Sequence, residues 1–264
     1  MTALLTSERV NRVAVVTLAR PPVNALNDEL IASLEGALGE ALADADVAVL
    51  HLRSHQKSFC AGADLAAMRS CFATPAGTEA MIATVQRMQR LFQRLEAAPV
   101  VTIAEIGGAA VGGGLELALA CDLRVAAAEA RLGLTEAGLG LLPAAGGTQR
   151  LTRLCGPAVA KRLILGAELV GGTEAQRLGL VQWAQPQERL AAWTSDLAAR
   201  IAAMPRAALI AIKRCVAAQS DPGRDGFAEE IEATRALYND PETRRRVSEF
   251  LSKKSTPEHT KELR

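Results

Sequence analysis

Apolar residues form two kinds of pattern along the first part of the chain. Short, mostly aliphatic runs predict buried strands over residues 13–18, 47–52, 100–104 and 123–126. Apolar residues with helical spacing follow Asn27 as far as Leu42, and asparagine is a preferred N-cap residue. A second helical pattern covers residues 78–95 and ends before Pro99. Because strands and helices alternate, the pattern predicts an α/β fold.

The pattern changes near residue 187. Just before this point, a capping-box motif at residues 173–176 predicts a short helix that Gly179 ends. Alanine-rich helical periods then follow, broken by prolines, over residues 188–203, 206–218, 225–238 and 242–253. We therefore expect an α/β core over residues 1–187 and a helical region over residues 188–264.

Three consecutive glycines, Gly112–Gly114, lead into Glu116 at the start of an apolar helical stretch. Glycines that open a helix leave backbone N–H groups accessible, and a helix N-terminus favours anions. A second glutamate, Glu136, follows twenty residues later in another glycine-containing segment. Anion-stabilising amides beside an acid/base carboxylate suit chemistry on a carbonyl compound. Close helix packing, with Glu116 in a salt bridge, explains the same pattern without any activity.

Two further segments of small residues, 59–65 and 143–151, predict tight turns. Two such turns can aim two backbone N–H groups at one oxygen. Cys60 could act as a nucleophile, but the sequence places no histidine to activate it, so we interpret it as a buried packing residue. His51, His55 and Cys60 lack a fourth ligand, and His51 falls in a predicted strand, so we expect no metal site.

The charge balance argues against nucleic acid as a partner, since 30 Lys and Arg against 29 Asp and Glu leave a net charge of +1. The run Arg244–Arg246 is interpreted as a solvated face or a phosphate contact. Five cysteines without a Cys-x-x-Cys motif indicate reduced thiols. With neither a signal-peptide pattern nor an apolar run of the ~18 residues that span a membrane, we expect a cytoplasmic protein without membrane partners. No Gly-x-Ser-x-Gly elbow is present for a serine hydrolase.

Together these segments resemble the enoyl-CoA hydratase/isomerase (crotonase) superfamily. The matching segments are Arg20–Leu26, Phe59–Leu65, Gly112–Asp122, Thr135–Glu136, Pro143–Leu151, Leu165–Gly166, Ala175 and Gly179–Val181. The resemblance implies a crotonase-like spiral of repeated ββα units with a helical C-terminal trimerisation region. It also implies a homotrimer or a homohexamer built as a dimer of trimers. The substrate would be an acyl-CoA thioester, and no cofactor is expected because coenzyme A is part of the substrate.

By position, the resemblance gives Ala63 and Gly113 the backbone amides of an oxyanion hole. Glu116 would align and deprotonate water, and Glu136 would exchange the proton at the α-carbon. The residues implied for substrate binding are Val23, Lys57, Ala61, Leu65, Met68, Phe72, Gly112 and Ala144. Among these, the carbonyl of Ala61 would lie near the CoA adenine.

The chain departs from the usual family pattern in three places. Pro22 stands where a basic residue often follows Arg-Pro, which leaves Lys57 as the candidate for a phosphate contact. Ala144 replaces a common glycine and leaves less room around the water. Gly107-Gly108 replaces a common Asn-Gly pair.

Because both glutamates are present, the resemblance favours an enoyl-CoA hydratase of the kind that acts in fatty-acid β-oxidation. Such an enzyme adds water across the 2,3 double bond of a 2-enoyl-CoA thioester to give a 3-hydroxyacyl-CoA. An enoyl-CoA isomerase, a decarboxylase, a carnitinyl-CoA-type dehydratase and a non-catalytic CoA- or RNA-binding protein remain alternatives.

Overall fold

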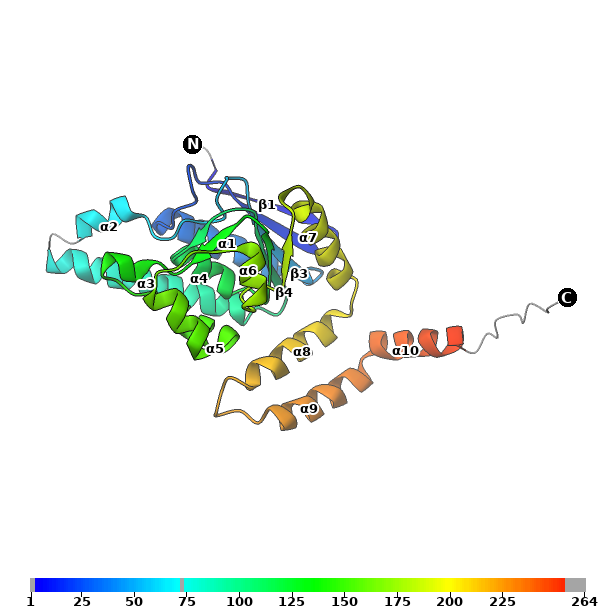
Figure 1. Ribbon diagram of the computed structural model, residues 1–264. Helices are drawn as coiled ribbons and strands as arrows, with labels where there is room; N and C mark the ends of the chain where they lie inside the picture. Colours follow the sequence, from blue (N-terminus) through cyan, green and yellow to red (C-terminus); the bar gives the residue numbers. More distant parts are fainter. Residues whose placement is uncertain (1–2, 72–73, 255–264) are drawn as a thin grey trace. The chain divides into compact units, whose positions relative to one another are not determined.

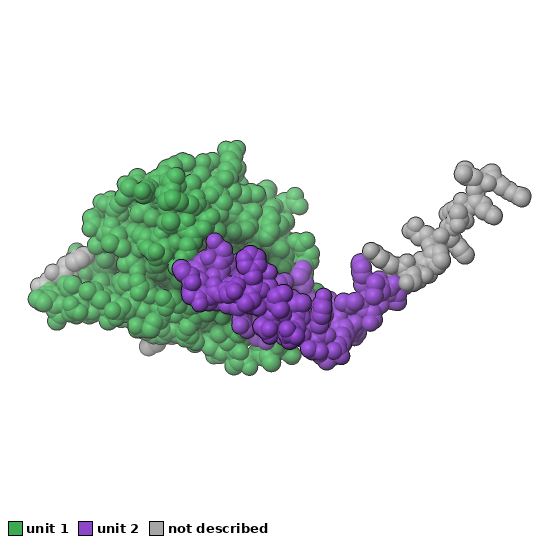
Figure 2. Space-filling view, turned by 90° about the horizontal axis from the view of Figure 1, so that it is seen from below, with its two compact units in different colours: residues 1–203 green, residues 204–264 purple. Residues whose placement is uncertain are grey.

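The computed structural model describes residues 3–71 and 74–254 of the chain. Two compact units divide between Ala203 and Met204, and Figure 2 colours them separately. This division lies further along the chain than the 187/188 boundary expected from composition. Helix α7 (Gln187–Ala202) belongs to the first unit because Leu190, Leu197 and other apolar residues of this helix are buried.

The main sheet of the first unit has six strands in the order β1-β2-β3-β4-β6-β9. Strands β1 and β2 pair antiparallel, and all the other neighbours pair parallel. The bounds are β1 Leu5–Val10, β2 Val13–Leu18, β3 Val49–Ser54, β4 Val101–Ile106, β6 Leu123–Ala127 and β9 Trp183–Gln185. Helices follow most of the parallel strands (Figure 1), which confirms the predicted α/β fold.

A second, smaller sheet has the order β5-β7-β8. Its strands are β5 Ala110–Val111, β7 Arg131–Gly133 and β8 Val170–Gly171. The helices of the first unit before α7 are α1 Asp28–Ala43, α2 Leu65–Cys71, α3 Pro75–Glu96, α4 Gly113–Leu119, α5 Gly147–Leu165 and α6 Gly172–Arg177, with a 3₁₀ turn, η1, at Glu136–Leu139.

The two faces of the main sheet pack against different helices. On β2, Val13 and Val15 lie on the face that α7 covers, where they line one cavity with Ala198. Val16 lies on the opposite face and meets Leu34 of α1 together with residues of α3 and α4. Alternate residues of a strand point to opposite faces, so a continuous apolar run such as β2 indicates a strand buried on both sides.

Of two helix caps predicted from the sequence, the structure confirms the one at α1 and contradicts the one at α6. The side chain of Asn27 accepts a hydrogen bond of 3.0 Å from the N–H of Leu30, so it caps α1 as predicted. The predicted capping box at residues 173–176 is not used, because α6 begins at Gly172 and has no side-chain cap. Gly179 has a φ of 77° and follows the end of α6.

The second unit consists of helices over its described residues. They are α8 Arg206–Ala218, α9 Gly226–Asn239 and α10 Pro241–Lys254, close to the predicted helical periods. Several large apolar side chains on them are exposed, namely Ile212, Val216, Phe227, Ile231, Tyr238, Val247, Phe250 and Leu251. Across residues 3–71 and 74–254, no helix is both long and apolar enough to span a membrane.

Candidate active site

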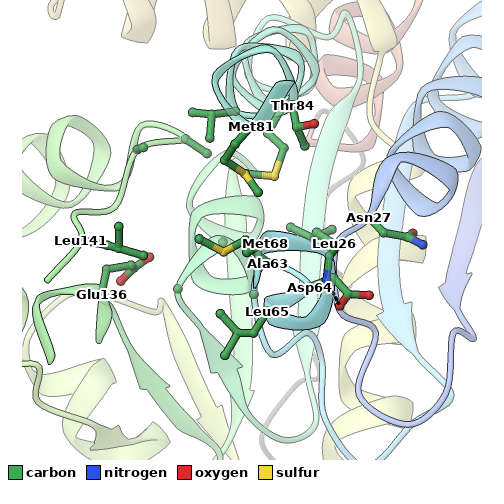
Figure 3. A pocket seen from close by; sticks show the side chains of 18 of the residues that line it. Leu26, Asn27, Ala63, Asp64, Leu65, Met68, Met81, Thr84, Glu136 and Leu141 are labelled. Atoms are coloured by element: carbon green, nitrogen blue, oxygen red, sulfur yellow. Dashed lines mark hydrogen bonds between the residues drawn. The ribbon is translucent and has the colours of Figure 1, made fainter. Parts of the chain in front are cut away.

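A cavity of about 550 Å³ brings together the three small-residue segments that the sequence analysis singled out. Its walls come from the loop at 61–65, the N-terminus of α4 and residues 135–145, with α2 and α3 beside them. Figure 3 shows Glu136 and Leu141 on one side of this space, Met68 and Met81 within it, and Leu26 and Asn27 on the far side.

Two backbone amides at the cavity wall have no acceptor in the described part of the chain. The bridge between Leu26 and Ala63 uses the N–H of Leu26 and the N–H of Asp64, which leaves the N–H of Ala63 unpaired. Gly113 is the first residue of α4, where backbone N–H groups have no partner within the helix. The two amides are close, because a Cβ on Gly113 would lie only 3.7 Å from the nitrogen of Ala63.

Glu116 lies one turn into α4 and is buried, with 2% of its surface exposed. Its Oε1 accepts a hydrogen bond of 2.7 Å from the N–H of Gly147 at the start of α5. Burial raises the pKa of Glu116 to about 7, and the nearby charge of Glu136 acts in the same direction. The hydrogen bond from Gly147 opposes this shift.

Glu136 begins η1 and lines the same cavity. Burial raises its pKa as well. Its Oε2 is buried and has no hydrogen-bond partner among the described residues. A buried carboxylate oxygen without a hydrogen-bond partner is costly. An oxygen of this kind therefore indicates a site where a ligand supplies the missing hydrogen bond.

Each glutamate lies against a glycine from a different segment. Gly112 has a φ of 54°, and a Cβ at this position would come within 3.0 Å of Oε1 of Glu136. A Cβ on Gly147 would come within 2.9 Å of Oε1 of Glu116. Gly147 lies in the segment 143–151, but no pattern in the sequence marks it as the partner of Glu116.

The structure brings most of the predicted substrate-binding residues to the cavity. The predicted residues that line it are Ala61, Leu65, Met68, Gly112 and Ala144. Val23 and Lys57 are not among its described lining residues; the carbonyl of Val23 accepts a hydrogen bond from Ala61, and Lys57 is exposed. Phe72 lies outside the described residues.

Sequence and structure comparisons identify the family. The enoyl-CoA hydratase/isomerase family model matches residues 8–260. The chain belongs to this family. A mitochondrial enoyl-CoA hydratase domain-containing protein 2 of Mus musculus is 46% identical over 187 residues, which cover 70% of this chain and 62% of that protein. The chain spans about three fifths of the length of several curated relatives that it matches.

Two further matches cover almost the full length of this chain. The 2,3-dehydroadipyl-CoA hydratase of Escherichia coli is 34% identical over 258 residues, which cover 97% of this chain and 98% of that protein. The crystal structure of an enoyl-CoA hydratase from Bacillus anthracis superposes with a TM-score of 0.88 at 31% identity, covering 98% of this chain and 100% of the other. The crotonase-like fold implied by the sequence is therefore confirmed.

Polar contacts fix the position of the loop that carries the Ala63 amide. The side-chain amide of Asn24 donates hydrogen bonds of 2.9 Å to the carbonyl of Phe59 and 2.8 Å to the hydroxyl of Ser54. Arg20 pairs with Asp64 at 2.7 Å. Arg20 and Asn24 lie in a matching sequence segment, but only the structure assigns them this positioning role.

The alternative chemistries considered from sequence are not supported by the geometry. Cys60 is fully buried, burial raises its pKa to about 12, and its thiol lies 3.0 Å from the carbonyl of Asn24. A thiol in this state is a packing residue, as the sequence analysis favoured. His51 pairs with Glu105 through a contact of 3.0 Å. Over the described ranges, no three His, Cys, Asp or Glu side chains are arranged to bind a metal ion.

Proposed function

We propose that this protein is an enoyl-CoA hydratase that adds water across the 2,3 double bond of a 2-enoyl-CoA thioester to give a 3-hydroxyacyl-CoA. The observation that carries this proposal is the pair of glutamates, Glu116 and Glu136, that face one cavity beside two unpaired amides. The names of the relatives support the same reaction type. These names do not agree on an acyl group, since one relative is named a crotonyl-CoA hydratase and the Escherichia coli relative a 2,3-dehydroadipyl-CoA hydratase.

The two amides would stabilise the charge that develops on the thioester oxygen as water attacks. The N–H groups of Ala63 and Gly113 are fixed by the β-bridge and by the start of α4, so they need little reorganisation during the reaction. A donor of this kind is worth about 3 kcal/mol of transition-state stabilisation. The helix N-terminus adds a favourable field for the anion.

The two glutamates would move the protons. Glu116 would orient the water and take its proton, since the hydrogen bond from Gly147 fixes one of its oxygens. Glu136 would deliver a proton to the α-carbon through Oε2, the oxygen without a protein partner. Two carboxyl groups in one apolar site share a proton more easily than they both ionise, so one can act as base while the other acts as acid.

Coenzyme A would be bound as part of the substrate, with no separate cofactor. Leu65 is 58% exposed beside Ala61 at the cavity wall, which suits a residue that contacts the nucleotide end. The exposed apolar side chains of α8, α9 and α10 support assembly as a homotrimer or homohexamer. All five cysteines are free thiols, which fits the cytoplasm.

The test is loss of the ultraviolet absorbance of conjugated enoyl-CoA thioesters, measured for the wild type, Glu116→Gln and Glu136→Gln. Each substitution should lower kcat about 10²-fold or more, because it removes a group that transfers a proton. Binding of a saturated acyl-CoA should change little. Glu129→Gln, at an exposed position, is the matched control and should keep full activity.

The hydration and isomerisation activities of the wild type and the variants distinguish a hydratase from an isomerase. If the wild type converts a 3-enoyl-CoA to a 2-enoyl-CoA but does not hydrate a 2-enoyl-CoA, the enzyme is an isomerase. If either glutamine variant hydrates 2-enoyl-CoA at nearly the wild-type rate, the two-glutamate mechanism is wrong.

A further inference from the structure

Every charged side chain that lines the cavity is acidic. These residues are Asp28, Glu29, Asp64, Glu116 and Glu136. Among the described lining residues there is no Lys, Arg or His. Phe72 and Ala73, between α2 and α3, lie outside the described residues and carry no charge. The described residues that line the cavity therefore place no cation against a substrate.

Three arginines contact residues that line the cavity, and each pairs with a protein carboxylate. Arg150 of α5 contacts Glu96 at 2.9 Å and donates a hydrogen bond to the carbonyl of Ala145. Arg87 of α3 contacts Glu35 of α1 at 2.6 Å and also donates to the carbonyl of Asp28. Arg20 pairs with Asp64 at 2.7 Å. None of these three arginines is among the residues that line the cavity. Their charges are thus balanced by protein carboxylates and do not serve a ligand.

One compartment of the cavity, between α2 and α3, suits a flexible apolar chain. Met68, Met81 and Met88 line it, and the first and last of these are buried. Figure 3 shows the side chains of Met68 and Met81 within this space, between Glu136 on one side and Leu26 on the other. Thioether side chains are flexible and polarisable, so they adapt to hydrocarbon chains of different shape.

The polar edge of this compartment is also acidic. Thr84 of α3 donates a hydrogen bond of 3.2 Å to Oδ1 of Asp28 at the N-terminus of α1. Both residues line the cavity. A hydroxyl that already donates to a carboxylate cannot donate to a second acceptor at the same time.

Building on the proposed hydratase function, we propose that this site selects 2-enoyl-CoA substrates with uncharged acyl chains and rejects those that end in a carboxylate. A terminal carboxylate would lose its hydration without gaining a counter-ion. It would also approach the carboxylate of Asp28 at the edge of this part of the cavity. The acyl group of this chain's substrate would then differ from the one in the name of the Escherichia coli relative.

The test compares trans-2-hexenoyl-CoA with 2,3-dehydroadipyl-CoA, which have acyl chains of the same length and differ in the terminal carboxylate. We expect kcat/KM to favour the uncharged substrate by about 100-fold or more, because the site offers no partner for the buried charge. Values of kcat/KM within threefold of each other would overturn the proposal. Hydration of neither substrate would instead count against the proposed function.

A cation placed in the compartment should reverse part of this preference. Met81→Lys adds an ammonium group to the lining, and Ile82→Lys adds one to the neighbouring residue of α3, which is 45% exposed and not among the lining residues. The ratio of kcat/KM for the two substrates should shift at least tenfold toward dehydroadipyl-CoA in Met81→Lys and stay constant in Ile82→Lys. If Met81→Lys fails to fold by circular dichroism, the wild-type ratio still decides the proposal.

Discussion

Replacing Glu116 with glutamine should stabilise the protein at neutral and alkaline pH, because the change removes a buried charge. Burial, helped by the charge of Glu136, raises the pKa of Glu116 from 4.5 to about 7. Glutamine has nearly the same shape and keeps an acceptor for the N–H of Gly147, which lies 2.7 Å from Oε1. The substitution therefore tests the ionisation of this residue and little else.

The sign of the effect follows from proton binding. The unfolded chain releases the proton of Glu116 near pH 4.5, whereas the folded chain keeps it up to about pH 7. Between these values the folded state binds more protons, so wild-type stability falls as pH rises. At about 1.4 kcal/mol for each pKa unit, the shift from 4.5 to about 7 corresponds to about 3 kcal/mol. This contribution is fully present below pH 4.5 and lost above pH 7.

Urea unfolding of the two proteins between about pH 5 and pH 8 measures the difference. The advantage of Glu116→Gln in the free energy of unfolding should grow by about 2–3 kcal/mol across this range. Both proteins are compared at one concentration, because assembly also stabilises the folded state. Glu129→Gln, at an exposed position, is the control. A difference between wild type and Glu116→Gln that does not change with pH would refute the reasoning.

Four further outcomes are expected. Gly113→Ala keeps the N–H but places a methyl group 3.7 Å from the nitrogen of Ala63, so the thioester should be displaced and kcat/KM per folded molecule should fall about 10²-fold; an unchanged value argues against the oxyanion hole. Gly112→Ala brings a Cβ within 3.0 Å of Oε1 of Glu136, so kcat should fall more than CoA affinity in parallel turnover and titration experiments. The kcat/KM of the wild type should fall below about pH 7, where Glu116 takes up a proton, and a flat pH profile contradicts its role as base. Light scattering should give a trimer or hexamer for the full chain and a smaller or insoluble species when residues from 204 onward are removed; a full-length monomer would contradict this.

The sequence predicted the elements that have a strong local pattern. Strand β2 coincides with the predicted residues 13–18, because a continuous apolar run is visible without knowledge of its neighbours. Strand β1 was not predicted; its sequence LTSERV is largely exposed, and it forms a strand by pairing with β2. Strands β5 and β8 have two residues each, which is too short for any periodicity.

Local patterns also revealed the two glutamates, because each carboxylate follows glycines within an apolar segment. The hydrogen bond from Gly147 to Glu116 joins residues 31 positions apart, and no pattern in the sequence links them. The sequence also could not predict that the described cavity lining holds no cation. Arg87 is on a helix that forms the wall, and only the contact with Glu35 shows that its charge is directed away from the cavity.

The position of the two glycines connects activity with stability. Gly112 precedes the helix of Glu116 but lies against Glu136, and Gly147 follows the turn of Glu136 but lies against Glu116. Each carboxyl group thus lies against backbone from the other segment, and a side chain at either glycine would collide with that carboxyl group. The same close backbone excludes water, which raises the pKa of both carboxyl groups and makes their charged forms costly. The arrangement proposed to let the pair transfer protons is therefore also the one that lowers the stability of the fold as Glu116 ionises.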